Sequence, residues 1–110
     1  MLQGKHIAIL ATDGYEQSEL TEPLKRLRDA DADVSIVSLK KGEIRGESNG
    51  QWADSVTVDK TIDEVSADDF DTLVIPGGLY NPDKLRANRK AVNFVRSMFD
   101  AKKPIAAICH

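Results

Sequence analysis

The sequence predicts an α/β fold in which a mostly parallel sheet is covered by helices on both faces. Three short apolar runs, at residues 6–11, 72–75 and 105–108, have the length and composition of strands that are buried on both faces. Segments with helical periodicity lie between these runs, and the connections are short. This alternation of strands and helices favours a doubly wound parallel sheet.

Two longer helices are expected between the strands. The first covers residues 16–28, where leucines recur at helical spacing. Asp13 and Glu16 are placed to form a capping box in front of it, and Pro23 is expected to bend it. The second helix starts near Asn88. Its apolar face is expected to carry Val92, Val95 and Phe99.

The remaining strands are expected at the rim of the sheet. Residues 32–39 alternate between apolar and polar with a period of two, which predicts an edge strand. Two short β candidates, at 43–46 and 55–58, lie on either side of the turn dipeptide Asn49-Gly50 and predict a small antiparallel hairpin. In a flavodoxin-like strand order 2-1-3-4, the three apolar strands are neighbours and their carboxyl ends face one crevice.

Length and composition exclude several classes of protein. The 110 residues fit a single domain over 1–110, and 41% apolar with 30% charged residues is typical of a globular protein. A net charge of −3 speaks against nucleic acid as a partner. The sequence has no apolar run long enough to span a membrane and no signal peptide, so a cytoplasmic location is expected. Because the chain has one cysteine and no phosphate-binding loop, we expect no metal site and no cofactor.

The chemistry of the sequence centres on Cys109, which follows the last apolar strand and is the only cysteine of the chain. A sharp turn there into a helix would expose the thiol and lower its pKa, as a nucleophile requires. The alternative is that Cys109 is a small buried apolar side chain. His110 is a candidate general base, and its backbone N–H is a candidate oxyanion donor.

Three more candidate site residues are expected near Cys109, at the edge where the parallel strands end. Gly78 allows the backbone to approach a ligand closely or to adopt a positive φ, and its N–H is a second candidate oxyanion donor, although a tight turn alone would also need glycine. A carboxyl group at Glu16 beside a thiolate would be protonated and donate a hydrogen bond to sulfur. Asp83 lies in the first turn of a short helix opened by Asn81 and Pro82, where an acid also has a purely structural use.

Four ordered motifs resemble the PfpI family of the glutamine-amidotransferase-like superfamily. They are Asp13-x-Tyr15-Glu16-x-x-Glu19-Leu20, Val74-Ile75-Pro76-Gly77-Gly78, Pro82-Asp83-x-Leu85-Arg86 and Lys103-Pro104-Ile105-Ala106-Ala107-Ile108-Cys109-His110. The similarity covers the whole chain, and the Ala-Ile-Cys-His ending is its most distinctive part. It implies a flavodoxin-like three-layer sandwich, of which this chain is the N-terminal part because family members continue past this histidine.

The resemblance also implies roles for the candidate residues. Cys109 matches the family's nucleophile, His110 its neighbouring histidine and Glu16 its glutamate, while the N–H groups of Gly78 and His110 match the oxyanion hole. In peptidase-like members an acid from a second subunit orients the histidine. Asp83 has that position here, where the family pattern has glutamate, so a homo-oligomer is expected.

These residues lead to two expectations for function. The first is a cysteine hydrolase that acts on small carbonyl, peptide or glycated-protein substrates, as an intracellular peptidase or a deglycase- or glyoxalase-like stress protein. The alternative is a non-catalytic redox-sensing stress protein or chaperone in which Cys109 is oxidised. An inert interaction module with an unreactive thiol is the third possibility.

Overall fold

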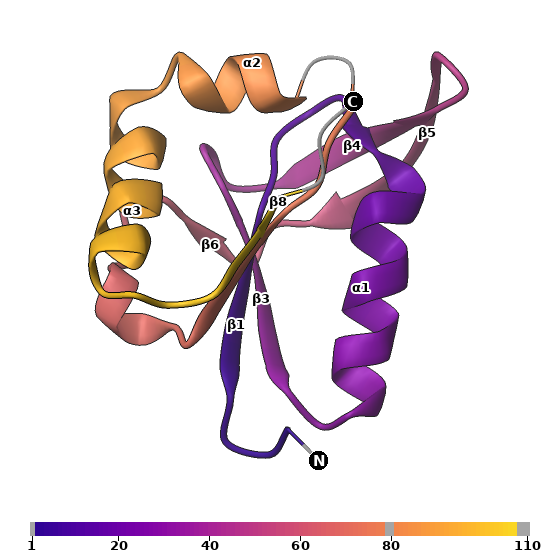
Figure 1. Cartoon of the computed structure of the whole chain (residues 1–110). Helices are drawn as coiled ribbons and strands as arrows, with labels where there is room; N and C mark the ends of the chain where they lie inside the picture. The colour runs from indigo at the N-terminus through magenta and orange to yellow at the C-terminus, as the bar shows by residue number, and fades with distance from the viewer. Residues whose placement is uncertain (1, 79–80, 108–110) are drawn as a thin grey trace.

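The main sheet of the protein is parallel and has five strands. The computed structural model describes residues 2–78 and 81–107, and for 81–83 the backbone only. The strands are ordered β6-β3-β1-β7-β8, with all four pairings parallel. Figure 1 shows β1, β3 and β8 crossing the middle of the molecule. Their bounds are His6–Leu10 for β1, Asp33–Ser38 for β3, Lys60–Thr61 for β6, Thr72–Ile75 for β7 and Ile105–Ala107 for β8. The four longer strands therefore have the predicted order 2-1-3-4.

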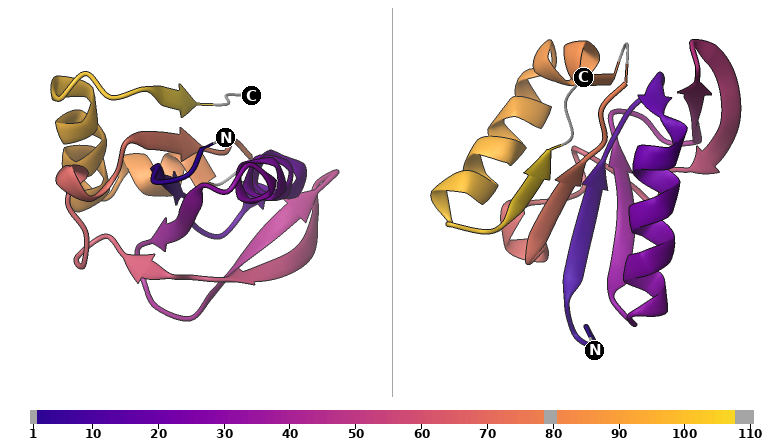
Figure 2. Two further views of the ribbon diagram at one scale, coloured as in Figure 1. Left: turned by 90° about the horizontal axis from the view of Figure 1, so that it is seen from below. Right: turned by 45° about the vertical axis from the view of Figure 1, so that its right-hand side comes forward.

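Helices cover both faces of this sheet, which confirms the three-layer sandwich. Helix α1, Gln17–Asp29, lies on one side, and α3, Arg89–Asp100, lies on the other (Figure 2). The short helix α2, Asn81–Arg86, and the 3₁₀ turn η1, Ala67–Asp69, both lie next to α3. None of the described helices has the length and apolar character needed to cross a membrane.

The sheet separates two apolar clusters because successive side chains of a strand point to opposite faces. In β1, Ile7 and Ile9 belong to the cluster under α1, whereas Ala8 and Leu10 belong to the cluster under α2 and α3. Both clusters continue with residues from several other elements. The first includes Tyr15, Leu20, Val34, Ile36, Ile44 and Val74, and the second includes Val37, Ile62, Phe70, Leu73, Leu85, Ala91, Phe94 and Met98.

A second, smaller sheet forms the predicted hairpin. Strands β4, Glu43–Ser48, and β5, Gln51–Thr57, pair antiparallel, and the two-residue strand β2, Tyr15–Glu16, pairs parallel with β4. Asn49 and Gly50 form the turn with φ values of 54° and 78°. Positive φ at both central residues is what a tight hairpin turn needs, and Asn-Gly provides it at low cost.

The beginning of α1 differs from the prediction. Its N-cap is Glu16, which makes no capping hydrogen bond with its side chain, so the expected capping box with Asp13 is wrong. The Asp13 carboxylate instead accepts a hydrogen bond from the backbone N–H of Arg45 in β4, at 2.8 Å. Pro23 lies within this helix. Tertiary contacts to the hairpin have therefore replaced the local capping bond.

Exposure at the edges of the sheet also differs from the prediction. The strand expected at the edge, β3, is flanked at its carboxyl end by the two residues of β6. The strand expected to be buried, β8, leaves Ala106 and Ala107 exposed, because in the described part of the chain it pairs only with β7 and α1 covers β3 instead. An apolar run alone does not indicate how many neighbours a strand has.

Helix α3 begins as predicted, but its buried stripe agrees only in part with the predicted one. The Asn88 side chain accepts a hydrogen bond from the Ala91 N–H at 3.0 Å, which is a standard N-cap. The buried residues of this helix are Ala91, Phe94 and Met98, and the predicted Val95 packs against the same cluster while partly buried. Phe99, placed on the apolar face by its sequence spacing, is instead 72% exposed.

Lys103 joins the start of β8 to η1. Its ammonium donates hydrogen bonds to the carbonyl oxygens of Ala67 and Phe70, both at 2.6 Å. We expect Lys103→Met to lower the free energy of unfolding by about 1.5–3 kcal/mol, because charge-assisted bonds are lost and the carbonyls stay partly buried. Urea denaturation measures this. Lys102→Met, at an exposed neighbouring position, is the control, and equal effects of the two substitutions would contradict the expectation.

Asp71 is expected to contribute to the loss of folding stability at low pH. Its carboxylate accepts a hydrogen bond from the His6 backbone N–H at 2.8 Å, and this bond, with nearby Lys5, lowers the pKa of Asp71. A lowered pKa stabilises the fold above the unfolded pKa of about 3.9, and this stabilisation disappears as the pH falls through the folded pKa. Urea titrations from pH 7 to pH 2 should therefore show Asp71→Asn losing less stability on acidification than the parent. Asp68→Asn, at an exposed position, should follow the parent curve.

Candidate functional site

The carboxyl ends of three neighbouring strands meet at one edge of the sheet. Strand β1 leads into residues 11–16, and β7 leads into Pro76, Gly77 and Gly78. In β8, the last described residue, Ala107, lies in register with Ile75 of β7. Parallel pairing therefore brings the end of β8 to the same edge. Cys109 and His110, which follow it in sequence, lie outside the described residues.

At this edge the peptide groups of Gly77 are held from two sides. The Gly77 carbonyl accepts a hydrogen bond from the Glu16 N–H at 2.9 Å, and the Gly77 N–H donates to the Glu19 carboxylate at 2.8 Å. Both partners belong to the first turn of α1 or to the residue before it. The helix start thus fixes the orientation of the backbone at the end of β7.

Gly78 lies so close to this segment that only glycine fits. Its φ is +128°, and a Cβ atom built on it would lie 2.4 Å from the Gly14 carbonyl oxygen and 2.6 Å from the Glu16 nitrogen. The structure thus has the positive φ that the sequence offers as one reason for glycine at this position. The atoms it approaches are backbone atoms of the same chain.

Two glutamates at the start of α1 contact this edge, one through its backbone and the other through its side chain. Glu16, the residue singled out from the sequence, is half-buried and contacts Gly77 through its backbone N–H. Glu19 is the glutamate whose carboxylate contacts Gly77, and the sequence reasoning did not assign it a role. A signal for it was present, because residues three apart lie on the same side of a helix. Glu47, which is 7% exposed and opposite Glu16 in the β2–β4 register, was also missed.

The remaining predicted site residue is Asp83. Helix α2 begins at Asn81, as the Asn-Pro-Asp sequence predicts. The side chain of Asp83 lies outside the described part of the structure. Of the predicted site residues, the structure therefore brings Glu16 and Gly78 together and leaves the positions of Cys109, His110 and the Asp83 side chain as predictions. Among the described residues, no three His, Cys, Asp or Glu side chains are grouped as metal ligands would be.

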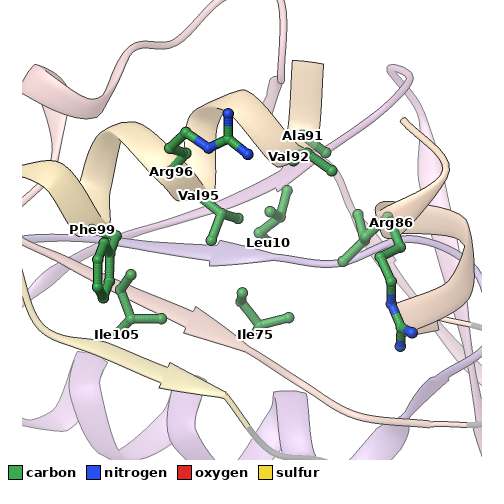
Figure 3. Close-up of a pocket in the computed structure, with 10 residues that line it drawn as sticks. Leu10, Ile75, Arg86, Ala91, Val92, Val95, Arg96, Phe99 and Ile105 are labelled. Atoms are coloured by element: carbon green, nitrogen blue, oxygen red, sulfur yellow. The ribbon is translucent and has the colours of Figure 1, made fainter. Parts of the chain in front are cut away.

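An open groove of about 690 Å³ lies elsewhere, on the face covered by α2 and α3. Figure 3 shows aliphatic side chains of β7, β8 and α3 pointing into it beside the ring of Phe99, with Arg86 and Arg96 at its margins. The groove is lined by Leu10, Ile75, Leu85, Arg86, Ala91, Val92, Val95, Arg96, Phe99 and Ile105. It contains none of the residues around Gly77, so it is a separate apolar surface.

Gly78→Ala tests the close approach at the strand end. Strain at positive φ and overlap with the backbone of residues 14–16 each cost about 1–3 kcal/mol, so we expect a loss of at least about 2 kcal/mol in the free energy of unfolding. Gly4→Ala is the matched control, because Gly4 has a φ of +80° but has nothing within 4 Å of an added Cβ. Denaturation curves that place both variants at the same stability would contradict the steric argument.

Comparison with known proteins identifies the family of the chain. The model of the DJ-1/PfpI family matches residues 5–110. General stress protein 18 of Bacillus subtilis is 43% identical over 108 residues, which are 97% of this chain and 60% of that protein. Deglycase PfpI of Pyrococcus furiosus is 44% identical over 104 residues, which are 94% of this chain and 60% of that protein. The chain thus spans about 60% of the length of these relatives.

A solved structure agrees with these matches. It is a two-domain protein of Anabaena variabilis that contains DJ-1/ThiJ/PfpI-like and ferritin-like domains, with a TM-score of 0.86 and 34% identity. The alignment covers 96% of this chain and 30% of that one. The fold, the matched residues and the sequence identities agree, and the chain belongs to the DJ-1/PfpI family.

Proposed function

We propose that the protein is a cysteine-dependent hydrolase whose site is the edge where β1, β7 and β8 end. The observation that carries this proposal is the fixed backbone at Gly77 and Gly78, held by Glu16 and Glu19 beside the strand that leads to Cys109. Backbone N–H groups with a fixed direction stabilise a developing oxyanion without reorganising during the reaction. The membership in a family with a deglycase among its members supports the same reading.

In the proposed reaction the Cys109 thiolate attacks a carbonyl carbon. A bond forms between sulfur and carbon, and the carbonyl electrons move to the oxygen, which the N–H groups of Gly78 and His110 stabilise. With a peptide substrate, the oxyanion collapses and expels the amine, which takes from His110 the proton that His110 received when the Cys109 thiol ionised. Water then hydrolyses the thioester and returns the thiol, with His110 as general base. Asp83 of a second subunit orients His110, so the active form is a homo-oligomer.

Two glutamates are candidates for the carboxyl group beside the thiol. The sequence motif favours Glu16, whereas the contact of its carboxylate with the Gly77 N–H at 2.8 Å favours Glu19. A carboxyl group beside Cys109 changes the thiol pKa when it is replaced by an amide, because either its charge or its donated proton is lost. Glu16→Gln and Glu19→Gln therefore separate the two candidates. Glu22→Gln, at an exposed position of the same helix, is the control.

The substrate class follows from the names of relatives and from the chemistry. A relative called a deglycase and one called a general stress protein support glycated protein or peptide as substrate. With a methylglyoxal adduct, the free amine leaves the carbon that carries it and sulfur takes its place as a hemithioacetal. A proton moves from this carbon to the neighbouring carbonyl carbon, which turns the hemithioacetal into a thioester without any external oxidant, and water then releases the carboxylic acid. An unmodified peptide is the competing substrate for the same nucleophile and oxyanion donors.

The experiment measures turnover of a peptide glycated with methylglyoxal and of the same peptide unmodified, using the 110-residue chain. Cys109→Ser should lower the rate by about 10³-fold or more, as loss of a nucleophile does. The pH dependence of Cys109 alkylation should give a thiol pKa well below 8.5. Equal turnover by the parent and Cys109→Ser would contradict the proposal. Absent turnover combined with oxygen added to Cys109 by mild peroxide would favour the redox-sensing alternative.

A further inference from the structure

The β4–β5 hairpin is attached to the segment that precedes α1 by hydrogen bonds from both of its strands. From β4, the Arg45 N–H donates to the Asp13 carboxylate, and the Arg45 carbonyl accepts from the Gly14 N–H, each at 2.8 Å. From β5, the Asp54 N–H donates to the Gln17 side-chain oxygen at 2.8 Å. The hairpin thus contacts residues 13–17, the same segment whose Glu16 N–H bonds to Gly77.

At the centre of this contact the ring of Tyr15 lies directly against Gly46. Tyr15 is fully buried, and a Cβ atom on Gly46 would lie 2.7 Å from its Cε2 atom and 2.9 Å from its Cζ atom. Gly46 does not have a positive φ, so the ring, and not the backbone conformation, requires glycine there. The function proposed above uses neither residue.

The polar end of Tyr15 also contacts the hairpin. Its hydroxyl donates a hydrogen bond to the Asp54 carbonyl at 3.5 Å. Burial of the ring, with the negative charges of Asp13 and Asp54, raises the pKa of Tyr15 to about 12. The hydroxyl is therefore a protonated donor throughout the neutral pH range.

The same segment also supports the end of strand β7. The Glu16 N–H donates to the Gly77 carbonyl, and the α-carbon of Gly78 lies against the Gly14 carbonyl and the Glu16 nitrogen. Residues 14–16 are thus in close contact with both glycines, with Gly46 through the Tyr15 ring and with Gly78 through their backbone. Closely packed backbone transmits a displacement because it has no free space to absorb one.

We infer that Tyr15 and Gly46 are positioning residues for the Gly77–Gly78 peptide, and that the hairpin sets the direction of the Gly78 N–H through them. Neither residue touches the reacting atoms; both act through the backbone of residues 14–16. The inference rests on the proposed function only where it assigns a catalytic use to the Gly78 N–H. The placement of that peptide can be measured without any activity.

The test uses Gly46→Ala, with Gly50→Ala as its matched control. An added Cβ at Gly46 overlaps the Tyr15 ring, whereas one at Gly50 in the turn meets nothing within 4 Å and only strains a positive φ. The readouts are the amide resonances of Glu16 and Gly77 and their hydrogen-exchange rates. We expect Gly46→Ala to shift both resonances and to speed exchange at both amides about tenfold or more relative to Gly50→Ala.

Two Tyr15 variants keep the test decisive if Gly46→Ala folds poorly. Tyr15→Leu removes the two ring atoms nearest to Gly46, so the double variant Gly46→Ala/Tyr15→Leu should fold and be perturbed less than the sum of the single variants. Tyr15→Phe keeps the ring and should keep slow exchange at both amides. Unchanged Glu16 and Gly77 amides in folded Gly46→Ala, or purely additive effects in the double variant, would overturn the inference.

Measuring turnover in the same variants then tests the positioning of the Gly77–Gly78 peptide and the proposed catalytic function separately. If positioning serves catalysis, Gly46→Ala lowers kcat with KM little changed, because the oxyanion is held only in the transition state. Displaced amides together with unchanged turnover would support the positioning and remove Gly78 from the proposed mechanism. Undisplaced amides together with lost turnover would overturn the positioning and leave the mechanism in place.

Discussion

The contact between Gly78 and the backbone of residues 14–16 is the constraint on which the candidate site depends. Three elements that are distant in sequence converge there: the first turn of α1, the end of β7 and, behind them, the β4–β5 hairpin. Any side chain at Gly78 would separate the first two. Because the backbone groups of Gly77 are also bonded on both sides, this corner of the sheet has one arrangement and little freedom to adopt another.

Much of this fold was predictable because it follows from periodicity and chain order. Continuous apolar runs separated by helical segments lead to a parallel sheet, and right-handed crossovers leave few possible strand orders. The hairpin was predictable for a local reason, since Asn49-Gly50 favours the positive φ values that its turn needs. The glycine requirement at Gly78 was likewise visible from its place directly after a buried strand.

What the sequence could not reveal depends on contacts between distant segments. Asp13 has the spacing of a capping residue but binds Arg45, 32 positions away. Glu19 carries the contact to Gly77, and nothing in a local pattern distinguishes it from Glu16. The exposure of Phe99 and Ala106 depends on which neighbours cover each surface, and a single strand or helix does not encode its neighbours.

Because the sheet divides the apolar core into two clusters, substitutions in one cluster affect the other cluster little. The candidate site rests on the cluster under α1, which includes Tyr15 and Leu20, while the groove is formed from the cluster under α2 and α3. Side chains on opposite faces of a sheet do not touch, so substitutions in one cluster combine almost independently with substitutions in the other. Evolution can therefore reshape the α2–α3 face while the geometry around Gly77 is preserved.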